Sequence, residues 1–318
     1  MATNEHELTP IRTAFIRFHL CSFVAVSAFA AAPQTYSLAW SPDGRTLALG
    51  GYKEVRLVDA GSKKTVATLS GMLEAVRALA FSRDGKLLAA AGGLPARKGE
   101  VKIWDAAGQR EIAAISGHSD CIYAAAFSAD GAQLATASYD RLIKLWDVAS
   151  GKEIRTMRDH IDAIYALAFT PNGKRLITGA ADRSVKVWDA ATGARLYTLS
   201  DSSDAVNAIA LSPDGARVAA GGADKTIRVW RLGEKEGALE NTLIAHEDAI
   251  LRLAWSADGK LASAAADRTI KLFRAADLTE VRSIPKLPDW AFGLEFAPGG
   301  KQLAAGYFNG ALEIYDVQ

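Results

Sequence analysis

Residues 117–147 read GHSDCIYAAAFSADGAQLATASYDRLIKLWD, and the rest of the chain largely repeats this stretch in altered copies. The stretch begins with a Gly-His pair, continues through an apolar run to Phe127, and ends on Leu145, Trp146 and Asp147. The tetrapeptide Ser-Ala-Asp-Gly follows Phe127, and its residue types favour a tight turn. Repetition at periods of roughly 40–45 residues is typical of arrays built from one supersecondary unit.

Seven such tetrapeptides divide the chain into units. Their final glycines are 41, 46, 42, 42, 44 and 41 residues apart, and the turns occupy residues 41–44, 82–85, 128–131, 170–173, 212–215, 256–259 and 297–300. Each turn lies between two apolar stretches, and a third stretch alternates apolar and charged residues, as in Ile143-Lys144-Leu145-Trp146. Alternation with a period of two indicates a half-exposed strand. A fourth, more polar stretch follows, so each unit is expected to be a four-stranded antiparallel sheet.

One such sheet cannot bury both of its faces, but seven stacked around an axis can, which predicts an all-β, seven-bladed β-propeller. The sequence resembles the WD40 repeat family, because Gly117-His118 opens a unit and Trp-Asp pairs close units at residues 104–105, 146–147 and 188–189. The resemblance covers residues 34–318. The last unit ends at its third strand, so the last blade is expected to be one strand short or to be closed by the N-terminal segment.

The first thirty residues differ in composition from the rest. Arg12, Arg17 and His19 precede an uncharged run that ends in Ala28-Phe29-Ala30. This pattern is typical of a secretory signal peptide, and the run is too short to span a bilayer as a helix. Residues 1–30 are therefore expected to be a signal peptide and residues 31–318 the propeller, with a periplasmic or secreted location. The alternative is that residues 22–29 form the closing outer strand and that the protein is cytoplasmic.

Composition excludes several function classes. The chain has 318 residues and a formal net charge of +1 without a basic run, so no nucleic-acid partner is indicated. The two cysteines, Cys21 and Cys121, and the histidines have no spacing typical of a zinc or haem site, so no metal or cofactor is expected. No stable membrane insertion is expected once a signal peptide is removed. The partner is expected to be an unidentified protein or peptide, and the propeller could belong to a larger complex.

Two units contain residue types that resemble a Ser/Thr-His-Asp catalytic triad. One set is His118, Thr136, Asp140 and Trp146, and the other is His160, Thr178, Asp182 and Trp188. The resemblance to the WD40 family implies that these are structural tetrads, in which Asp, His and hydroxyl bond in series to the indole N–H. A catalytic set would occur once and not in successive repeats. No catalytic residue is therefore expected. The fifth unit keeps Asp224 and Trp230 but has Ser202 and Ala220 in the other two positions, so its tetrad is expected to be lost.

A second set of residues occurs near the start of each first strand and beside the hairpin aspartates. In the WD40 family, partner peptides commonly dock at such positions on the top face of the propeller. Exposed Tyr, Trp and Arg are typical of interface hot spots. The predicted partner-binding residues are Tyr36, Arg77, Tyr123, Tyr139, Tyr165, Leu251, Trp290, Phe292 and Phe308. These aromatic residues could instead pack on neighbouring blades.

The leading functional hypothesis is a non-enzymatic scaffold that binds a protein or peptide on the top face or rim. The alternative is a propeller that uses its central channel to bind a small molecule or metal, or for hydrolysis. The sequence offers no pair of histidines at metal spacing, no Gly-rich phosphate loop and no unpaired acidic group that stands outside the repeat pattern. We therefore expect a scaffold and not an enzyme.

Overall fold

The computed structural model describes residues 33–317, and these fold as seven antiparallel β-sheets, which we call blades 1–7. Blade 1 contains β1 (Ser37–Trp40), β2 (Thr46–Gly50), β3 (Tyr52–Asp59) and β4 (Thr65–Ala75), and blade 2 contains β5 (Ala78–Phe81), β6 (Leu87–Leu94), β7 (Lys98–Asp105) and β8 (Arg110–Ser116). Blade 3 contains β9 (Ile122–Phe127), β10 (Gln133–Ser138), β11 (Leu142–Asp147) and β12 (Glu153–Arg158), and blade 4 contains β13 (Ile164–Phe169), β14 (Arg175–Ala180), β15 (Val185–Asp189) and β16 (Arg195–Leu199).

The remaining three blades follow the same order. Blade 5 contains β17 (Val206–Leu211), β18 (Arg217–Gly222), β19 (Thr226–Leu232) and β20 (Gly237–Ile244). Blade 6 contains β21 (Ile250–Trp255), β22 (Lys260–Ala265), β23 (Ile270–Arg274) and β24 (Thr279–Ile284), and blade 7 contains β25 (Ala291–Phe296), β26 (Gln302–Tyr307) and β27 (Leu312–Asp316). The predicted seven-bladed propeller is confirmed, and blade 7 has three strands within the described residues.

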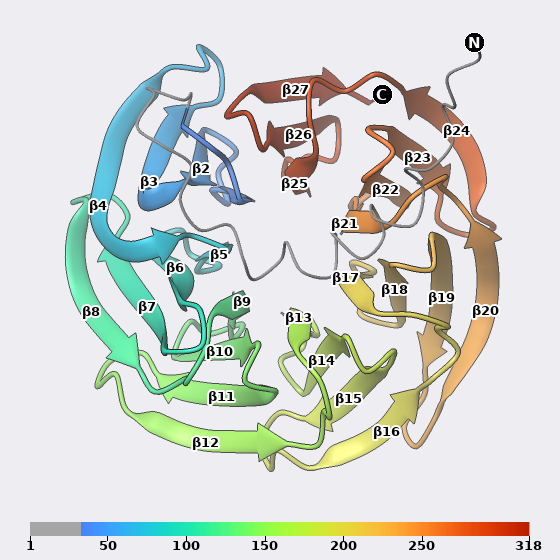
Figure 1. Cartoon of the computed structure of the whole chain (residues 1–318), viewed down its shortest axis with the longest axis horizontal. Coiled ribbons are helices and arrows are strands. Elements are labelled where there is room, and N and C mark those ends of the chain that lie inside the picture. Colours follow the sequence, from blue (N-terminus) through green and yellow to red (C-terminus); the bar gives the residue numbers. More distant parts are fainter. Residues whose placement is uncertain (1–32, 318) are drawn as a thin grey trace, which may run out of the picture. The chain divides into compact units, whose positions relative to one another are not determined.

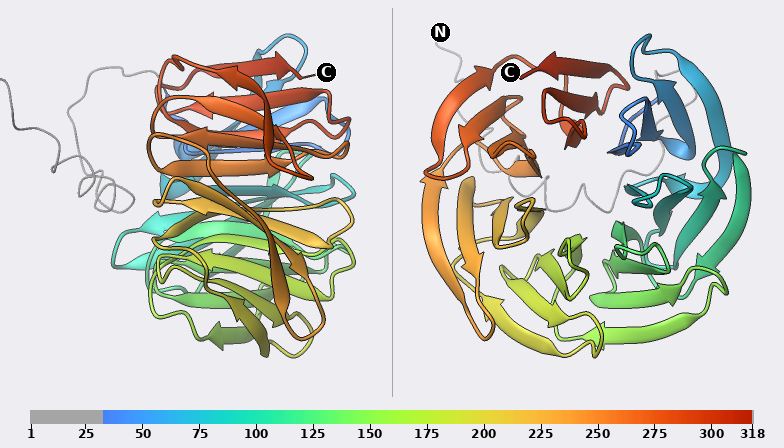
Figure 2. Two further views of the ribbon diagram at one scale, coloured as in Figure 1. Left: turned by 90° about the vertical axis from the view of Figure 1, so that its right-hand side faces the viewer. Right: turned by 180° about the vertical axis from the view of Figure 1, so that it is seen from behind.

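Within residues 33–317, the blades form a ring in which the first strand of each blade lies innermost (Figures 1 and 2). Residues of all seven first strands line a pocket at the centre of the ring, which we call the channel. Strands that are consecutive in sequence pair side by side, so each blade is built from local hairpins. We call the face where these innermost strands begin the top face. The predicted signal peptide and the alternative closing strand both lie outside the described residues.

Each predicted tetrapeptide turn joins the first two strands of a blade. In blade 3 the Gly131 N–H donates to the Ser128 carbonyl at 2.9 Å, and Gly131 has a φ of 71°, which glycine adopts without steric cost. The Ser128 hydroxyl donates to Asp130, whose carboxylate also accepts from the Ala132 N–H. The Ser, Asp and Gly of the repeat therefore specify this hairpin through local hydrogen bonds.

The core of the propeller is divided into seven hydrophobic clusters, one between each pair of neighbouring blades. The cluster between blades 3 and 4, for example, includes Leu145, Met157 and Trp188. Around the ring, the clusters at the other blade pairs repeat this arrangement. Because each sheet buries its faces only against its neighbours, closing the ring is what completes the core.

Candidate functional site

The residues that resemble a catalytic triad in blade 3 form one continuous hydrogen-bonded chain. His118 Nδ1 lies 2.9 Å from Asp140 Oδ2, and His118 Nε2 lies 2.8 Å from Thr136 Oγ1. The Trp146 indole N–H donates to the same Thr136 oxygen at 2.8 Å. Gly117 packs against this indole, since a Cβ at Gly117 would lie 2.8 Å from Trp146 Cη2. The Gly-His pair of the repeat therefore fits the Trp of its own blade.

Blade 4 repeats the same arrangement. His160 lies 2.7 Å from both Asp182 Oδ2 and Thr178 Oγ1, and the Trp188 indole donates to Thr178 at 2.9 Å. Burial alone would raise the pKa of Asp182, but hydrogen bonds from His160 and Ser184 outweigh it and lower the pKa to about 2. Asp182 therefore stays ionised at neutral pH and acts as the acceptor that orients the chain.

Burial argues against nucleophilic catalysis by these sets. Thr136 and Thr178 are fully buried, at 0% exposure, and His118 and His160 are nearly so. Each threonine oxygen already contacts both a histidine and an indole, so a substrate cannot approach it while the blades are packed. The recurrence of the set in two neighbouring blades is also unlike a catalytic site, which occurs once.

Blades 5 and 6 show how the set varies. Blade 5 lacks the His and Thr of the tetrad, and its Trp230 indole N–H donates instead to Asp201 Oδ2 at 2.8 Å. Asp224 instead pairs with Arg228 at 2.6 Å. In blade 6, His246 contacts the Asp267 carboxylate and the Ser263 hydroxyl, with Phe273 at the Trp position. A buried indole donor thus keeps an acceptor in blade 5 even where His and Thr are absent.

Most of the predicted partner-binding residues lie together on the top face. In blades 3–7 a β-bulge falls near the start of the innermost strand, and the residues without a register partner are Tyr123, Tyr165, Asn207, Leu251 and Phe292. A bulge changes the direction of a side chain, and here it explains why residues at the strand start line the channel mouth. The pocket at this mouth is lined by all of these bulged residues except Leu251.

Eight of the nine predicted partner-binding residues form a continuous series of ring contacts, which we call the top-face arc. Tyr123 contacts the rings of Tyr139 and Tyr165, with centroids 6.2 and 5.3 Å apart. The Arg77 guanidinium lies over the rings of Tyr123 and Tyr36, at 4.9 and 6.0 Å. The series then continues through contacts of 5.8–6.2 Å between successive residues: Tyr36, Phe308, Phe292 and Trp290.

The top-face arc covers five blades, from blade 4 through blades 3, 2 and 1 to blade 7. Leu251 of blade 6 is not part of it, because leucine has neither a ring nor a guanidinium, and its side chain is buried at 6% exposure. Tyr123 is also buried, at 8% exposure, whereas the other seven members are half-buried. The arc residues therefore pack partly on one another, as the alternative reading of the sequence expected.

Sequence reasoning missed Ile161, which lies on the top face beside the arc. Its side chain is 78% exposed, and it lines a groove between blades 3 and 4 together with Tyr139 and Asp162. The groove has a volume of about 500 Å³ and also includes the carboxylates of Asp120 and Asp140. At this position blades 3, 5 and 6 have Ser119, Ser203 and Glu247, so comparison of the copies could have identified the isoleucine.

Glu295 is an acidic residue that departs from the repeat pattern and that sequence reasoning missed. It lies on the innermost strand of blade 7, where the six other blades all have alanine: Ala39, Ala80, Ala126, Ala168, Ala210 and Ala254. Its carboxylate accepts from the Trp40 backbone N–H of blade 1 at 2.9 Å. Burial raises the pKa of Glu295 to about 7, and the hydrogen bond from Trp40 only partly opposes this.

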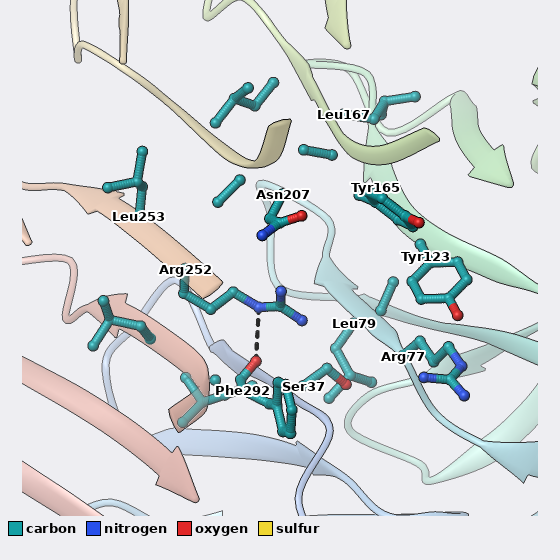
Figure 3. A pocket seen from close by; sticks show the side chains of 18 of the residues that line it. Ser37, Arg77, Leu79, Tyr123, Tyr165, Leu167, Asn207, Arg252, Leu253 and Phe292 are labelled. Atoms are coloured by element: carbon teal, nitrogen blue, oxygen red, sulfur yellow. Dashed lines mark hydrogen bonds between the residues drawn. The ribbon is translucent and has the colours of Figure 1, made fainter. Parts of the chain in front are cut away.

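Arg252 also departs from the repeat pattern and was also missed. The sequence analysis selected the preceding residue, Leu251, and did not consider Arg252. Its side chain extends from β21 into the channel pocket (Figure 3). The guanidinium Nε donates to the Phe292 carbonyl of blade 7 at 2.7 Å. Alignment of the innermost strands shows the signal, because only blade 6 carries a long side chain at this register.

Residues 33–317 contain no group of three His, Cys, Asp or Glu side chains placed to hold a metal ion. They also contain no helix that is long and apolar enough to cross a membrane.

Comparison with known proteins identifies the repeat. The family model described as "WD domain, G-beta repeat" matches residues 63–105, 109–147, 151–189, 193–231 and 237–274, which is more than half of the chain. Each matched segment joins the outer strand of one blade to the first three strands of the next. The unmatched strands β1–β3 and β25–β27 include Val58 and Tyr315 at the Trp position. No curated protein matches the chain. The chain belongs to the WD40 repeat family, and its described residues form the seven-bladed propeller of that family.

Proposed function

We propose that this protein is a non-enzymatic scaffold that binds a protein or peptide across the top-face arc. WD40 propellers commonly serve as scaffolds for protein interactions. The observation that carries the proposal is the arc itself, in which seven aromatic rings and Arg77 are in contact across five blades. Large, pre-ordered aromatic side chains bind partners at a low cost in conformational entropy.

The groove beside the arc supports a partner with a particular chemistry. Ile161 offers an exposed apolar contact, and the carboxylates of Asp120 and Asp162 lie in the same groove. Both carboxylates already accept backbone N–H bonds, from Cys121 and Ala163, so they are held in place. We infer that the groove accepts a basic or apolar side chain of the partner while the arc contacts its aromatic or aliphatic residues.

Peptide selection on the purified full chain tests this proposal. A displayed library of random peptides would be selected against the wild-type protein, and affinities of the selected peptides would be measured by fluorescence polarisation. We expect the double variant Tyr123→Ala/Tyr165→Ala to bind them at least about tenfold more weakly, as for the loss of interface hot spots.

A matched control removes apolar surface at the face opposite the top face, where two outer strands begin. Val66 and Leu196 are exposed and lie at the starts of β4 and β16. The variant Val66→Ala/Leu196→Ala should bind the peptides as the wild type does. The proposed surface would be refuted if the two double variants bound the selected peptides equally well. It would also be refuted if those peptides bound neither the arc nor the groove.

A further inference from the structure

Arg252 interrupts a ring of small residues in the central channel. The registers of the innermost strands place it level with Ser37, Ala78, Ala124, Ala166, Ala208 and Gly293. Since alanine fits this position in four blades, the architecture does not require an arginine in blade 6. The long cationic side chain therefore needs a reason beyond the packing of the blade.

Among residues 33–317, the hydrogen bonds of the Arg252 guanidinium all go to backbone carbonyls. Nε donates to the Phe292 carbonyl at 2.7 Å and Nη1 to the Leu251 carbonyl at 2.9 Å, and Nη2 lies 3.5 Å from the Tyr36 carbonyl. Each Nη atom has a further N–H, so donors remain beyond these contacts. Carbonyls fix the position of the guanidinium in the channel without supplying the negative charge that would balance it.

The surroundings of Arg252 are cationic. No ion pair formed among residues 33–317 includes Arg252, and no Asp or Glu lines the pocket that contains it. A second arginine, Arg77, lines the same pocket. Burial, together with the nearby positive charge of Arg77, lowers the pKa of Arg252 to about 10, so it is still positively charged at neutral pH. The Arg252 side chain is half-buried, and a partly desolvated cation without an anionic partner is costly, because its lost hydration is not repaid.

We propose that the central channel is a binding site for a small oxyanion, a carboxylate or a phosphate, with Arg252 as its principal ligand. The pocket has a volume of about 180 Å³, which is several times the volume of one water molecule and large enough for an anion of a few heavy atoms. A guanidinium matches the oxygens of carboxylate and phosphate through paired hydrogen bonds. The proposal does not depend on binding at the top-face arc.

The competing explanation is that Arg252 only connects blade 6 to blade 7 and blade 1 through the carbonyls of Phe292 and Tyr36. The two explanations differ in their response to anions. If Arg252 only donates to these carbonyls, the protein should be less stable without Arg252, and phosphate should not change its stability. If the channel binds an anion, phosphate should stabilise the protein only when Arg252 is present.

Thermal unfolding and calorimetric titration with sodium phosphate and with sodium acetate, in a zwitterionic buffer low in chloride, test the site. We expect millimolar phosphate or acetate to raise the Tm of the wild-type chain by about 2 °C or more and to bind with measurable heat. The two titrations identify which oxyanion is preferred. In Arg252→Ala the increase in Tm should disappear, and Arg252→Lys should bind at least about tenfold more weakly.

The matched control is Arg97→Ala, which removes one positive charge from an exposed loop and should respond to both anions as the wild type does. If Arg252→Ala does not fold, the wild-type titration and Arg252→Lys still decide the question. The proposal fails if the wild type shows no binding to either anion, or if Arg252→Lys and the wild type bind equally.

Discussion

The interface of blades 3 and 4 and the interface of blades 7 and 1 join similar sheets by different means. Blades 3 and 4 each contain a buried His-Thr-Asp-Trp chain, with Trp188 in the cluster between them. Between blades 7 and 1, Trp40 is held by Glu295, through its backbone N–H to the carboxylate and its indole N–H to the carbonyl. The first interface depends on an acid that stays ionised, and the second on an acid whose charged form is disfavoured.

This difference follows from where each acid finds its partners. Asp182 accepts hydrogen bonds from His160, Ile161 and Ser184, which stabilise its anion. Glu295 accepts a hydrogen bond from the neutral backbone amide of Trp40, which does not compensate for its lost hydration. Two carboxylates in one propeller therefore have pKa values that are shifted in opposite directions.

The largest expected effect comes from Asp182→Ala, which removes the acceptor for the His160 ring, the Ile161 N–H and the Ser184 hydroxyl. Leaving these groups without a partner should lower the free energy of unfolding by about 3 kcal/mol. Urea denaturation measures it. The control is Asp189→Ala, at the end of β15 in the same blade, which removes only exposed hydrogen bonds from Thr192, so the loss should be below about 1 kcal/mol. Equal losses in both variants would show that the buried chain does not brace blade 4.

The second prediction concerns pH and Glu295. Its pKa is raised in the folded state from 4.5 to about 7, so the folded protein binds more protons than the unfolded chain between these values. The contribution of Glu295 to stability is therefore fully present below about pH 4.5 and is lost as the pH rises through about 7. We expect a loss of about 2 kcal/mol, allowing for water in the channel.

Glu295→Gln keeps an acceptor for the Trp40 N–H without a titrating group. The free energy of unfolding, measured from pH 4.5 to 8, should fall with rising pH in the wild type, and the share of this fall that Glu295 causes should be absent in the variant. Asp182 has the opposite sign: its pKa is lowered from 3.8 to about 2, so its contribution is lost as the pH falls through that range. Identical pH profiles for the wild type and Glu295→Gln would refute the role assigned to Glu295.

A smaller effect is expected in blade 5, where Asp201 accepts the hydrogen bond from the buried Trp230 indole. Because Asp201 is exposed, water can partly replace it, and Asp201→Ala should lower the free energy of unfolding by about 1 kcal/mol. Asp201→Asn restores an acceptor and should recover most of this loss. If both variants are as stable as the wild type, the indole in blade 5 does not need the carboxylate that replaces the His-Thr pair.

The smallest effect is expected for the ion pair between Lys63 and Glu313, which connects blades 1 and 7 at 3.3 Å. Both side chains are largely exposed, at 44% and 50%, so Lys63→Ala should change the free energy of unfolding by less than about 0.5 kcal/mol. The change should vanish in about 1 M salt, where exposed charges are screened. A large, salt-resistant loss would show that this pair, and not Glu295, closes the ring.

Patterns that recur in every unit could be predicted from the sequence. The seven turns and the two tetrads are specified by residues that lie within one blade, so the same local hydrogen bonds form each time the pattern returns. Five residues of the top-face arc could be singled out as a set because they occupy one position of the repeat: Tyr36, Arg77, Tyr123, Tyr165 and Phe292. Leu251 shares that position but is buried, which only the packing of blade 6 determines.

The residues that were missed are single departures from the repeat. Arg252 and Glu295 occupy positions that are small in the other blades. Arg252 contacts the Phe292 carbonyl of blade 7, and Glu295 contacts the Trp40 N–H of blade 1. Asp201 replaces the usual acceptor of the Trp230 indole from the position that Gly117 occupies in blade 3. Comparison of the copies can identify such departures, but it cannot show which groups they contact.

The sequence by itself determined the propeller and the number of its blades. These follow from short-range periodicity and from turn chemistry, which act between residues close together in the chain. The hydrogen-bonded chains within blades 3 and 4 were expected from the resemblance to the WD40 family. Only the tertiary structure decided that the ring residues form a continuous arc, that Arg252 lines the channel pocket and that Glu295 contacts blade 1. Their charge states depend on burial and on partners contributed by other blades, and closing the ring brings these groups together.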